Sequence, residues 1–191
     1  MEKPILSGDQ NLSYLENREL INAEKLIEVA KFDEAIQLLN NFSENSAVTH
    51  DERISYYILM CFLLMKMGEK EKFLDYAEKA WQAIQGQKDS LQTLDVYIVK
   101  AWSYTLEFKN DKALDLLLKS ENLCNIVTQE PLNILLRRKA DIMWNKSSIY
   151  RSKGLLDKAL DHAEQALKLR KKLDLKADIV MSLSLIKEIY H

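Results

Sequence analysis

The side chains best suited to chemistry are three histidines, two cysteines and scattered carboxylates, and their spacing matches no common catalytic or metal-binding pattern. His50, His162 and His191 lie far apart, and no His-Glu-x-x-His sequence for zinc occurs. No nucleophile has a base at a recognisable spacing, which leaves only a triad assembled from distant residues. The four glycines are too dispersed to form a phosphate-binding loop. We therefore expect no enzyme activity, no metal and no cofactor.

The two cysteines, Cys61 and Cys124, lie within helical patterns and show no pairing or metal-ligand spacing. Buried thiols of this kind are typical of a reducing compartment. The first residues contain no apolar core of a signal peptide, and no apolar run approaches the roughly 20 residues that span a bilayer. We expect a cytoplasmic protein without a membrane partner.

The charges nearly cancel, because 27 basic and 29 acidic side chains give a formal net charge of -2. This balance argues against nucleic acid or an anionic membrane as the main partner. Two basic clusters occur, at 137–139 and 170–172, each followed closely by acidic residues. We interpret both as solvated helix faces. A phosphate-binding patch is the alternative, and it is the one feature that would suit RNA.

The composition predicts helices throughout. Only 4 glycines and 2 prolines occur in 191 residues, and leucine, lysine, glutamate and alanine, which are strong helix formers, dominate. No stretch alternates apolar and polar residues for long enough to indicate a strand.

An internal repeat organises these helices. An aromatic residue or leucine recurs at positions 26, 64, 104, 150 and 190, with separations of 38, 40, 46 and 40 residues. In the first four repeats, a position that is usually alanine follows nine residues later, after an expected turn. A constant spacing within each repeat and variable spacing between repeats indicate a helix-turn-helix with connections of different length.

Small residues in the first helix of each repeat let its partner helix approach closely, and they stand at four corresponding positions: Ala23, Cys61, Ala101 and Ser147. Gly68 and Gly154 can adopt the left-handed conformation that ends a helix, whereas Ala30 and Phe108 do so less favourably. Capping boxes are expected at Thr49 with Glu52 and at Asp89 with Gln92, and residues 128–131 fit a third helix start.

The pattern resembles the tetratricopeptide repeat (TPR) family over roughly residues 15–190. The resemblance is strongest from Tyr150 to Leu160 and on to Leu167. Departures from the family pattern are Phe73 where alanine is usual, Phe42 at a small position, and Lys100 and Lys146 where the first helix is usually apolar. Repeat lengths near 40 rather than 34 imply longer helices.

The resemblance implies an all-α fold: a right-handed α-solenoid of four helix-turn-helix hairpins plus a C-terminal helix. We expect a flexible segment at 1–13 and a repeat domain at 14–191. The repeats are expected at about 15–46, 49–86, 89–127 and 131–173, followed by a final helix at 176–190.

First helices in this family line an inner groove where peptides or partner helices bind. The same register predicts partner contacts in the second, third and fourth repeats, centred on the aromatic residues because these dominate binding hot spots. The predicted contacts are Ile58, Phe62, Met65, Ile98, Trp102, Trp144, Asn145 and Arg151. The alternative is that the next hairpin covers these residues, which would then be ordinary core.

The groove is expected to be apolar and to bind a protein or peptide. Family members that hold a terminal carboxylate use lysine, asparagine and arginine at inner positions. In the first three repeats those positions carry mainly Leu20, Glu24, Ser55, Leu59, Asp95 and Val99. Without the cations, a carboxylate has no partner, so an amphipathic helix or an extended hydrophobic peptide fits better.

The final helix gives a second hypothesis. It is apolar but has no following hairpin half, whereas repeat arrays normally end in a polar cap. It is expected to pack on the fourth repeat, to pair with another copy, to accept a ligand helix, or to belong to a longer array. Self-assembly would use Ile179, Leu183, Ile186 and Tyr190.

Overall fold

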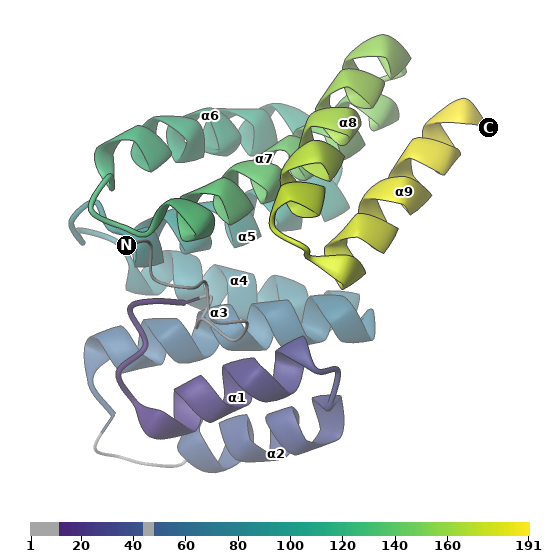
Figure 1. The fold of residues 1–191 in the computed structure, drawn as a ribbon. Coiled ribbons are helices and arrows are strands. Elements are labelled where there is room, and N and C mark those ends of the chain that lie inside the picture. The colour runs from purple at the N-terminus through teal and green to yellow at the C-terminus, as the bar shows by residue number, and fades with distance from the viewer. Residues whose placement is uncertain (1–11, 44–47) are drawn as a thin grey trace, which may run out of the picture. The chain divides into compact units, whose positions relative to one another are not determined.

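The computed structural model describes residues 12–43 and 48–191, and in these ranges all regular structure is α-helical (Figure 1). The all-α prediction is confirmed for this part of the chain. None of its helices is both long and apolar enough to cross a membrane. The helices are α1 Arg18–Glu28, α2 Phe32–Ser43, α3 His50–Met67, α4 Lys70–Ala83, α5 Leu91–Leu106, α6 Asn110–Ile126, α7 Leu132–Ser152, α8 Leu156–Lys172 and α9 Lys176–Tyr190.

The contacts divide the chain into two compact units, Met1–Tyr76 and Ala77–His191, with the boundary inside α4. The four predicted repeats contain, in order, α1 with α2, α3 with α4, α5 with α6, and α7 with α8. The grouping into one repeat domain stays a prediction. Most of the segment expected to be flexible, 1–13, lies outside the described residues, but Leu12 within it is buried.

The first unit is built on α1 and α2, which pack against each other and against α3. Ala23 on α1 and Cys61 on α3 are fully buried, as expected for positions where helices cross. Beside them, the Tyr56 ring lies 5.9 Å from the ring centroids of both Phe42 and Tyr76, and the Tyr56 and Tyr76 hydroxyls lie 3.1 Å apart. The hydrogen bond pairs the hydroxyl of Tyr56, which is buried, with that of Tyr76, which is partly buried.

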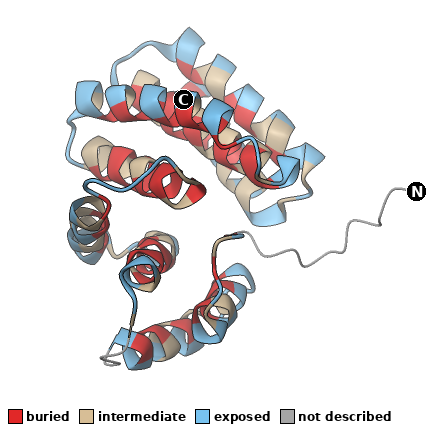
Figure 2. Cartoon of the chain, turned by 90° about the vertical axis from the view of Figure 1, so that its left-hand side faces the viewer, coloured by how far each residue is buried: buried red, intermediate tan, exposed pale blue. Residues whose placement is uncertain are grey.

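In the second unit, α7 packs against α5, α6 and α8, and α9 packs against α7 and α8. Ala101 and Ser147 are fully buried at the crossing positions. The Ser147 hydroxyl donates to the carbonyl of Ala159 on α8 at 2.7 Å, so a polar side chain is accommodated at a close helix contact. Figure 2 shows buried residues in red along the helix faces that pack.

Of the two capping boxes predicted from the sequence, one is confirmed and the other is wrong. The Thr49 and Glu52 capping box is confirmed, with Thr49 accepting the Glu52 N–H and the Glu52 carboxylate accepting the Thr49 N–H. The box expected at Asp89 and Gln92 is wrong. Ser90 caps α5 instead and accepts the Thr93 N–H at 3.1 Å, one residue later than expected. Serine and aspartate cap about equally well, so residue type alone could not choose between them.

Left-handed residues end several first helices. Gly68 and Gly154 have φ values of 74° and 72°, and the non-glycine residues Ala30 and Phe108 have 60° and 59°. Phe108 is also 82% exposed. A side chain in this conformation costs about 1 kcal/mol or more, so two of the four turns carry backbone strain that glycine avoids.

We expect Gly154→Ala to lower the free energy of unfolding by about 1 kcal/mol, because the left-handed backbone disfavours a Cβ. A Cβ at Gly154 meets nothing within 4 Å, so the cost is one of backbone alone. Phe108→Gly is expected to raise the free energy of unfolding, because glycine adopts the left-handed conformation without this cost. Urea unfolding followed by circular dichroism measures both, and equal stability of Gly154→Ala and the native chain would contradict the argument.

Candidate partner-binding site

Two tryptophans from neighbouring first helices meet in the second unit. Trp102 on α5 and Trp144 on α7 have ring centroids 4.7 Å apart and ring planes inclined by 40°. Both side chains are only partly buried. Trp144 also packs against a core cluster that includes Leu185 and Ile189 of α9, and the Arg170 guanidinium lies 5.7 Å from its ring centroid. The pair therefore rests on core residues while keeping some of its surface open.

Three buried polar atoms in or beside this pair have no hydrogen-bond partner in the described part of the chain. They are the Trp144 Nε1 donor, the Asn145 Oδ1 acceptor and the Arg170 Nε donor. The other side of the Asn145 amide is satisfied, since Nδ2 donates to the Asp141 carbonyl at 2.9 Å. A buried polar atom left unpaired costs about 1–3 kcal/mol.

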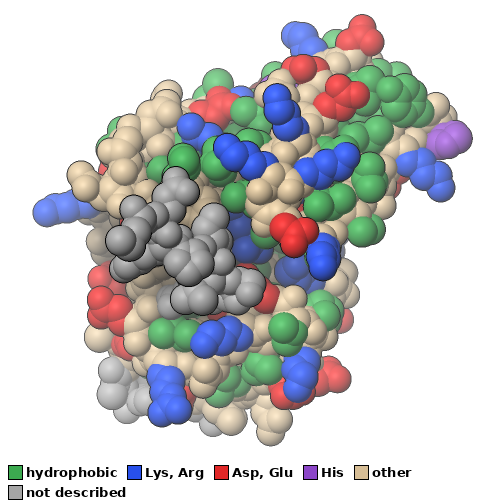
Figure 3. Space-filling view, viewed as in Figure 1, with side chains coloured by type: hydrophobic (Ala, Val, Ile, Leu, Met, Phe, Trp, Pro, Cys, Tyr) green, Lys and Arg blue, Asp and Glu red, His purple; other side chains and the backbone are tan. Residues whose placement is uncertain are grey.

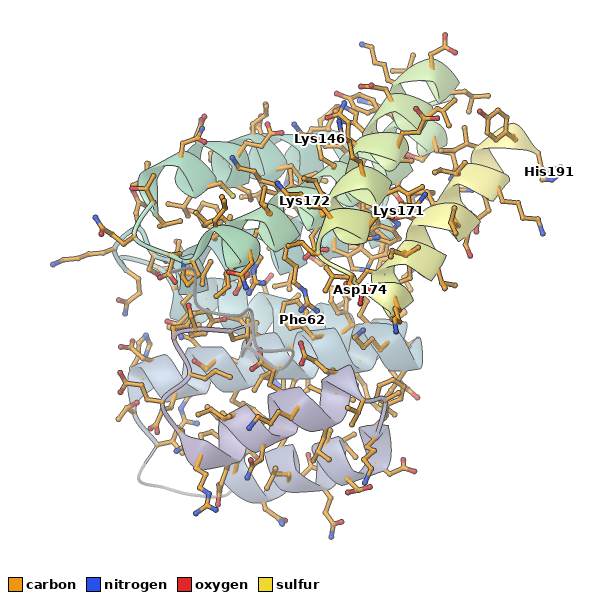
Figure 4. All side chains as sticks on the ribbon, viewed as in Figure 1. Phe62, Lys146, Lys171, Lys172, Asp174 and His191 are labelled. Carbon is orange, nitrogen blue, oxygen red and sulfur yellow. The ribbon has the colours of Figure 1, made fainter. Side chains whose placement is uncertain are left out.

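The other predicted contacts are placed differently. Ile58, Ile98 and Asn145 are buried and offer almost no surface. Phe62 and Met65 are partly exposed on α3 in the first unit, where Figure 4 labels Phe62. Arg151, at the end of α7, is exposed and pairs with Glu188 of α9 at 2.8 Å. Within a single unit, the structure brings together Trp102 and Trp144.

The interpretation of the first basic cluster as a solvated face is wrong for Arg138, whose side chain is 1% exposed. Its Nε and Nη2 donate to the two carboxylate oxygens of Asp95 at 2.6 and 2.9 Å. This two-pronged pair joins α7 to α5. Sequence reasoning missed it because the two residues are 43 positions apart and neither has an obvious partner nearby in the chain.

The second basic cluster, 170–172, also contains both buried and exposed residues. Lys171 and Lys172 are exposed at the end of α8 (Figure 4), as expected, but Arg170 is buried. Arg170 donates to Asp141 on α7 at 3.1 Å, and to the Ser182 hydroxyl and the Asp178 carbonyl on α9 at 2.8 and 3.0 Å. One guanidinium therefore joins three helices, and it lies over the Trp144 ring.

The two lysines that depart from the family pattern are explained by ion pairs with a preceding helix. Lys100 binds Glu78 at 2.5 Å, and Lys146 binds Glu121 at 2.6 Å. The hydrogen bond from Lys100 holds the pKa of Glu78 below its usual value. The separations, 22 and 25 residues, are similar in both repeats. A glutamate in the second helix before each lysine was the available sequence signal.

The environments of the two cysteines and of His162 give no support for a catalytic site. Burial raises the pKa of the Cys61 thiol and raises that of Cys124 to about 11, which disfavours a thiolate. The His162 ring stacks on Tyr150 at 5.2 Å, and burial lowers its pKa. In residues 12–43 and 48–191, no group of three or more metal-ligating side chains could hold an ion.

Comparisons with known proteins bear on the fold. No protein-family model and no curated protein matches the chain. The crystal structure of BtubC (BKLC) from P. vanneervenii is similar, with a TM-score of 0.59 over 90% of this chain and 70% of that chain. The sequence identity is 19%, so the similarity supports a shared helical fold and nothing about function.

We expect Asp95→Leu to lower the free energy of unfolding by about 3–5 kcal/mol, because it leaves the Arg138 charge buried without its main partner. The double variant Asp95→Leu with Arg138→Met removes both charges and should recover most of that loss. Urea unfolding of the native chain, both single variants and the double variant gives the coupling energy. A single variant within about 1 kcal/mol of the native chain would contradict a structural role for the pair.

Proposed function

We propose that the chain is a protein interaction module that binds an apolar peptide or partner helix, with Trp102 and Trp144 as the central contacts. The observation that carries this proposal is the partly exposed tryptophan pair on α5 and α7. Tryptophan is strongly enriched in binding hot spots, because it buries a large area with few rotatable bonds. Tryptophan surface that the chain itself leaves partly uncovered is suited to contact with a binding partner.

The neighbouring polar atoms support a peptide as the ligand. The unpaired Trp144 Nε1 can donate to a carbonyl, and the unpaired Asn145 Oδ1 can accept from an N–H. A peptide backbone offers carbonyl acceptors and N–H donors. Since both atoms are buried, small side-chain movements must accompany binding, as is common at interfaces. Arg151 lies at the exposed end of α7 and offers a rim contact.

The finer fold prediction belongs to the same proposal. A right-handed α-solenoid of TPR-like hairpins would carry α5 and α7 as neighbouring first helices of its inner face, and Ile58, Phe62, Met65 and Ile98 would belong to the corresponding positions of the preceding repeats. The first helices also carry the fully buried small residues that such hairpins require. The buried, unpaired cysteines fit the proposed cytoplasmic location.

RNA fits this surface less well than protein does. The arginines that suggested a phosphate-binding patch, Arg138 and Arg170, are buried and paired with Asp95 and Asp141. Neutralised guanidinium groups contribute little to phosphate binding. An interaction module, and not an enzyme, is accordingly the function we propose.

Peptides selected from a random phage-displayed library against the full chain test the proposal. We expect apolar sequences that bind the native chain and bind Trp102→Ala at least tenfold more weakly, because loss of a hot-spot aromatic costs about 2 kcal/mol or more. Fluorescence anisotropy with synthetic peptides measures the affinities.

Trp81→Ala is the matched control, since Trp81 is also partly buried and contacts an aromatic ring, that of Tyr97, with centroids 5.7 Å apart and planes inclined by 50°. It should leave peptide affinity within about twofold of native. Selected peptides that bind native chain and folded Trp102→Ala equally would place the binding surface elsewhere.

Self-association through α9 is a second candidate, and one observation favours it. Val180, Leu183 and Tyr190 are 62%, 48% and 68% exposed on a helix whose other face packs on α7 and α8. Figure 3 shows hydrophobic side chains gathered over α8 and α9. Ile179 and Ile186, also predicted contacts, are partly buried. Leucine and tyrosine exposed together on one helix suit a symmetric pairing of two copies.

If α9 mediates self-association, Leu183→Glu should shift the chain toward monomer, because a charge is costly in an apolar interface. Analytical ultracentrifugation over a range of protein concentrations measures the association constant. Leu118→Glu, at a leucine 52% exposed on α6, is the control and should change nothing. A native chain that stays monomeric at the highest concentration would exclude this candidate.

A further inference from the structure

Residues 12–15, the segment that precedes α1, pack into the first unit. Leu12 and Leu15 are buried, and Leu15 donates its N–H to the Leu12 carbonyl at 3.1 Å, which closes a turn around Ser13 and Tyr14. Figure 1 draws this segment as the purple trace leading into α1. The turn brings two buried leucines, three positions apart, next to each other at the start of the first unit.

The segment is tied to α1 by a buried carboxylate. The Leu12 N–H donates to Glu24 Oε1 at 2.6 Å, and Glu24 is itself buried. Glutamate is rarely buried unless its charge is compensated. Here part of the compensation comes from a backbone N–H of a different segment, twelve residues earlier. A charge-assisted hydrogen bond of this kind is among the stronger contacts that a peptide backbone can make.

By its register in the repeat, Glu24 corresponds to aromatic residues that are predicted to contact a partner in later repeats. It lies two residues before the repeated aromatic-or-leucine position of its repeat, the register position that Phe62 and Trp102 occupy in the second and third repeats. Leu20, one helical turn earlier on the same face of α1, is also buried. The first helix of the first repeat thus carries a carboxylate where the third carries an aromatic contact.

We propose that the face of α1 formed by Leu20 and Glu24 is a second binding surface, and that residues 12–15 occupy it as an internal ligand. The partner that fits is the first turn of an amphipathic helix bearing a Leu-x-x-Leu sequence. The first N–H groups of a helix have no acceptor within that helix, and its N-terminus favours a negative charge. Glu24 supplies both the acceptor and the charge. Such a partner competes with residues 12–15.

A fluorescein-labelled synthetic peptide with the sequence of residues 10–17 tests this surface in trans. The host is the full chain carrying Leu12→Ser and Leu15→Ser, which removes the internal leucines. We expect the peptide to bind this host at least tenfold more tightly than the native chain. Adding Glu24→Met, which removes the acceptor but keeps a similar length, should weaken binding at least tenfold.

Trp102→Ala in the same host is the control and should leave binding of this peptide unchanged, so the result stands apart from the fate of the tryptophan site. A host that melts cooperatively but does not bind the peptide would overturn the proposal. So would equal binding to host and native chain. A peptide with both leucines replaced by serine should fail to bind.

Amide hydrogen exchange of the native chain decides the matter if the double variant does not fold. An internal ligand detaches without unfolding its site, so the amides of Leu12 and Leu15 should exchange faster than those of Ala23 and Glu24, which lie beyond the first turn of α1, with a weaker dependence on denaturant. Exchange of all four amides in one cooperative step, with the same denaturant dependence, would show that the segment is integral core and would overturn the proposal.

Discussion

The close approach of paired helices at small residues is the constraint on which the rest of the structure depends. Ala23, Cys61, Ala101 and Ser147 are all fully buried, one in each predicted repeat. A larger side chain at any of these positions would push the helices apart. Trp102 and Trp144 stand two and six positions before the repeated aromatic-or-leucine position, and their rings meet between α5 and α7.

Buried ion pairs fix the same helices in register. Asp95 and Arg138 join α5 to α7, and Arg170 joins α8 to α7 and α9. Replacing such pairs with apolar residues is often neutral for stability, so specificity of packing is the role best suited to them. In this chain both pairs involve α7, which carries Trp144. The two arginines that the sequence predicted on solvated helix faces are instead buried and paired with Asp95 and Asp141.

The sequence predicted the elements well because their signals are local. Helical composition, the nine-residue spacing and the Thr49 capping box depend on residues less than about three turns apart, and each is reflected in the structure. The Asp89 cap was wrong by one residue, because Ser90 serves equally well. The solvated interpretation of Arg138 and Arg170 was wrong, because their partners lie 43 and 29 positions away and only the fold brings them together.

The sequence predicted which helices carry the candidate site residues, but it did not predict how far each residue is buried. Register places Ile58, Ile98 and the tryptophans on first helices, but it does not say which neighbours cover them. Ile58 and Ile98 are buried, whereas Trp102 and Trp144 keep part of their surface open. The contact of Leu12 with Glu24 left no sequence signal at all, since an N–H donor belongs to every residue except proline.

The indole N–H signals of the native chain test the central claim most directly. The sequence contains three tryptophans, so a nitrogen-labelled sample gives three resolved indole signals in a two-dimensional NMR spectrum. On titration with a selected apolar peptide, Trp102 and Trp144 should shift while Trp81 stays in place. The Trp144 signal should move downfield as its unpaired N–H gains an acceptor. Saturable binding that moves Trp81 and leaves Trp102 and Trp144 unchanged would contradict a binding surface centred on the tryptophan pair.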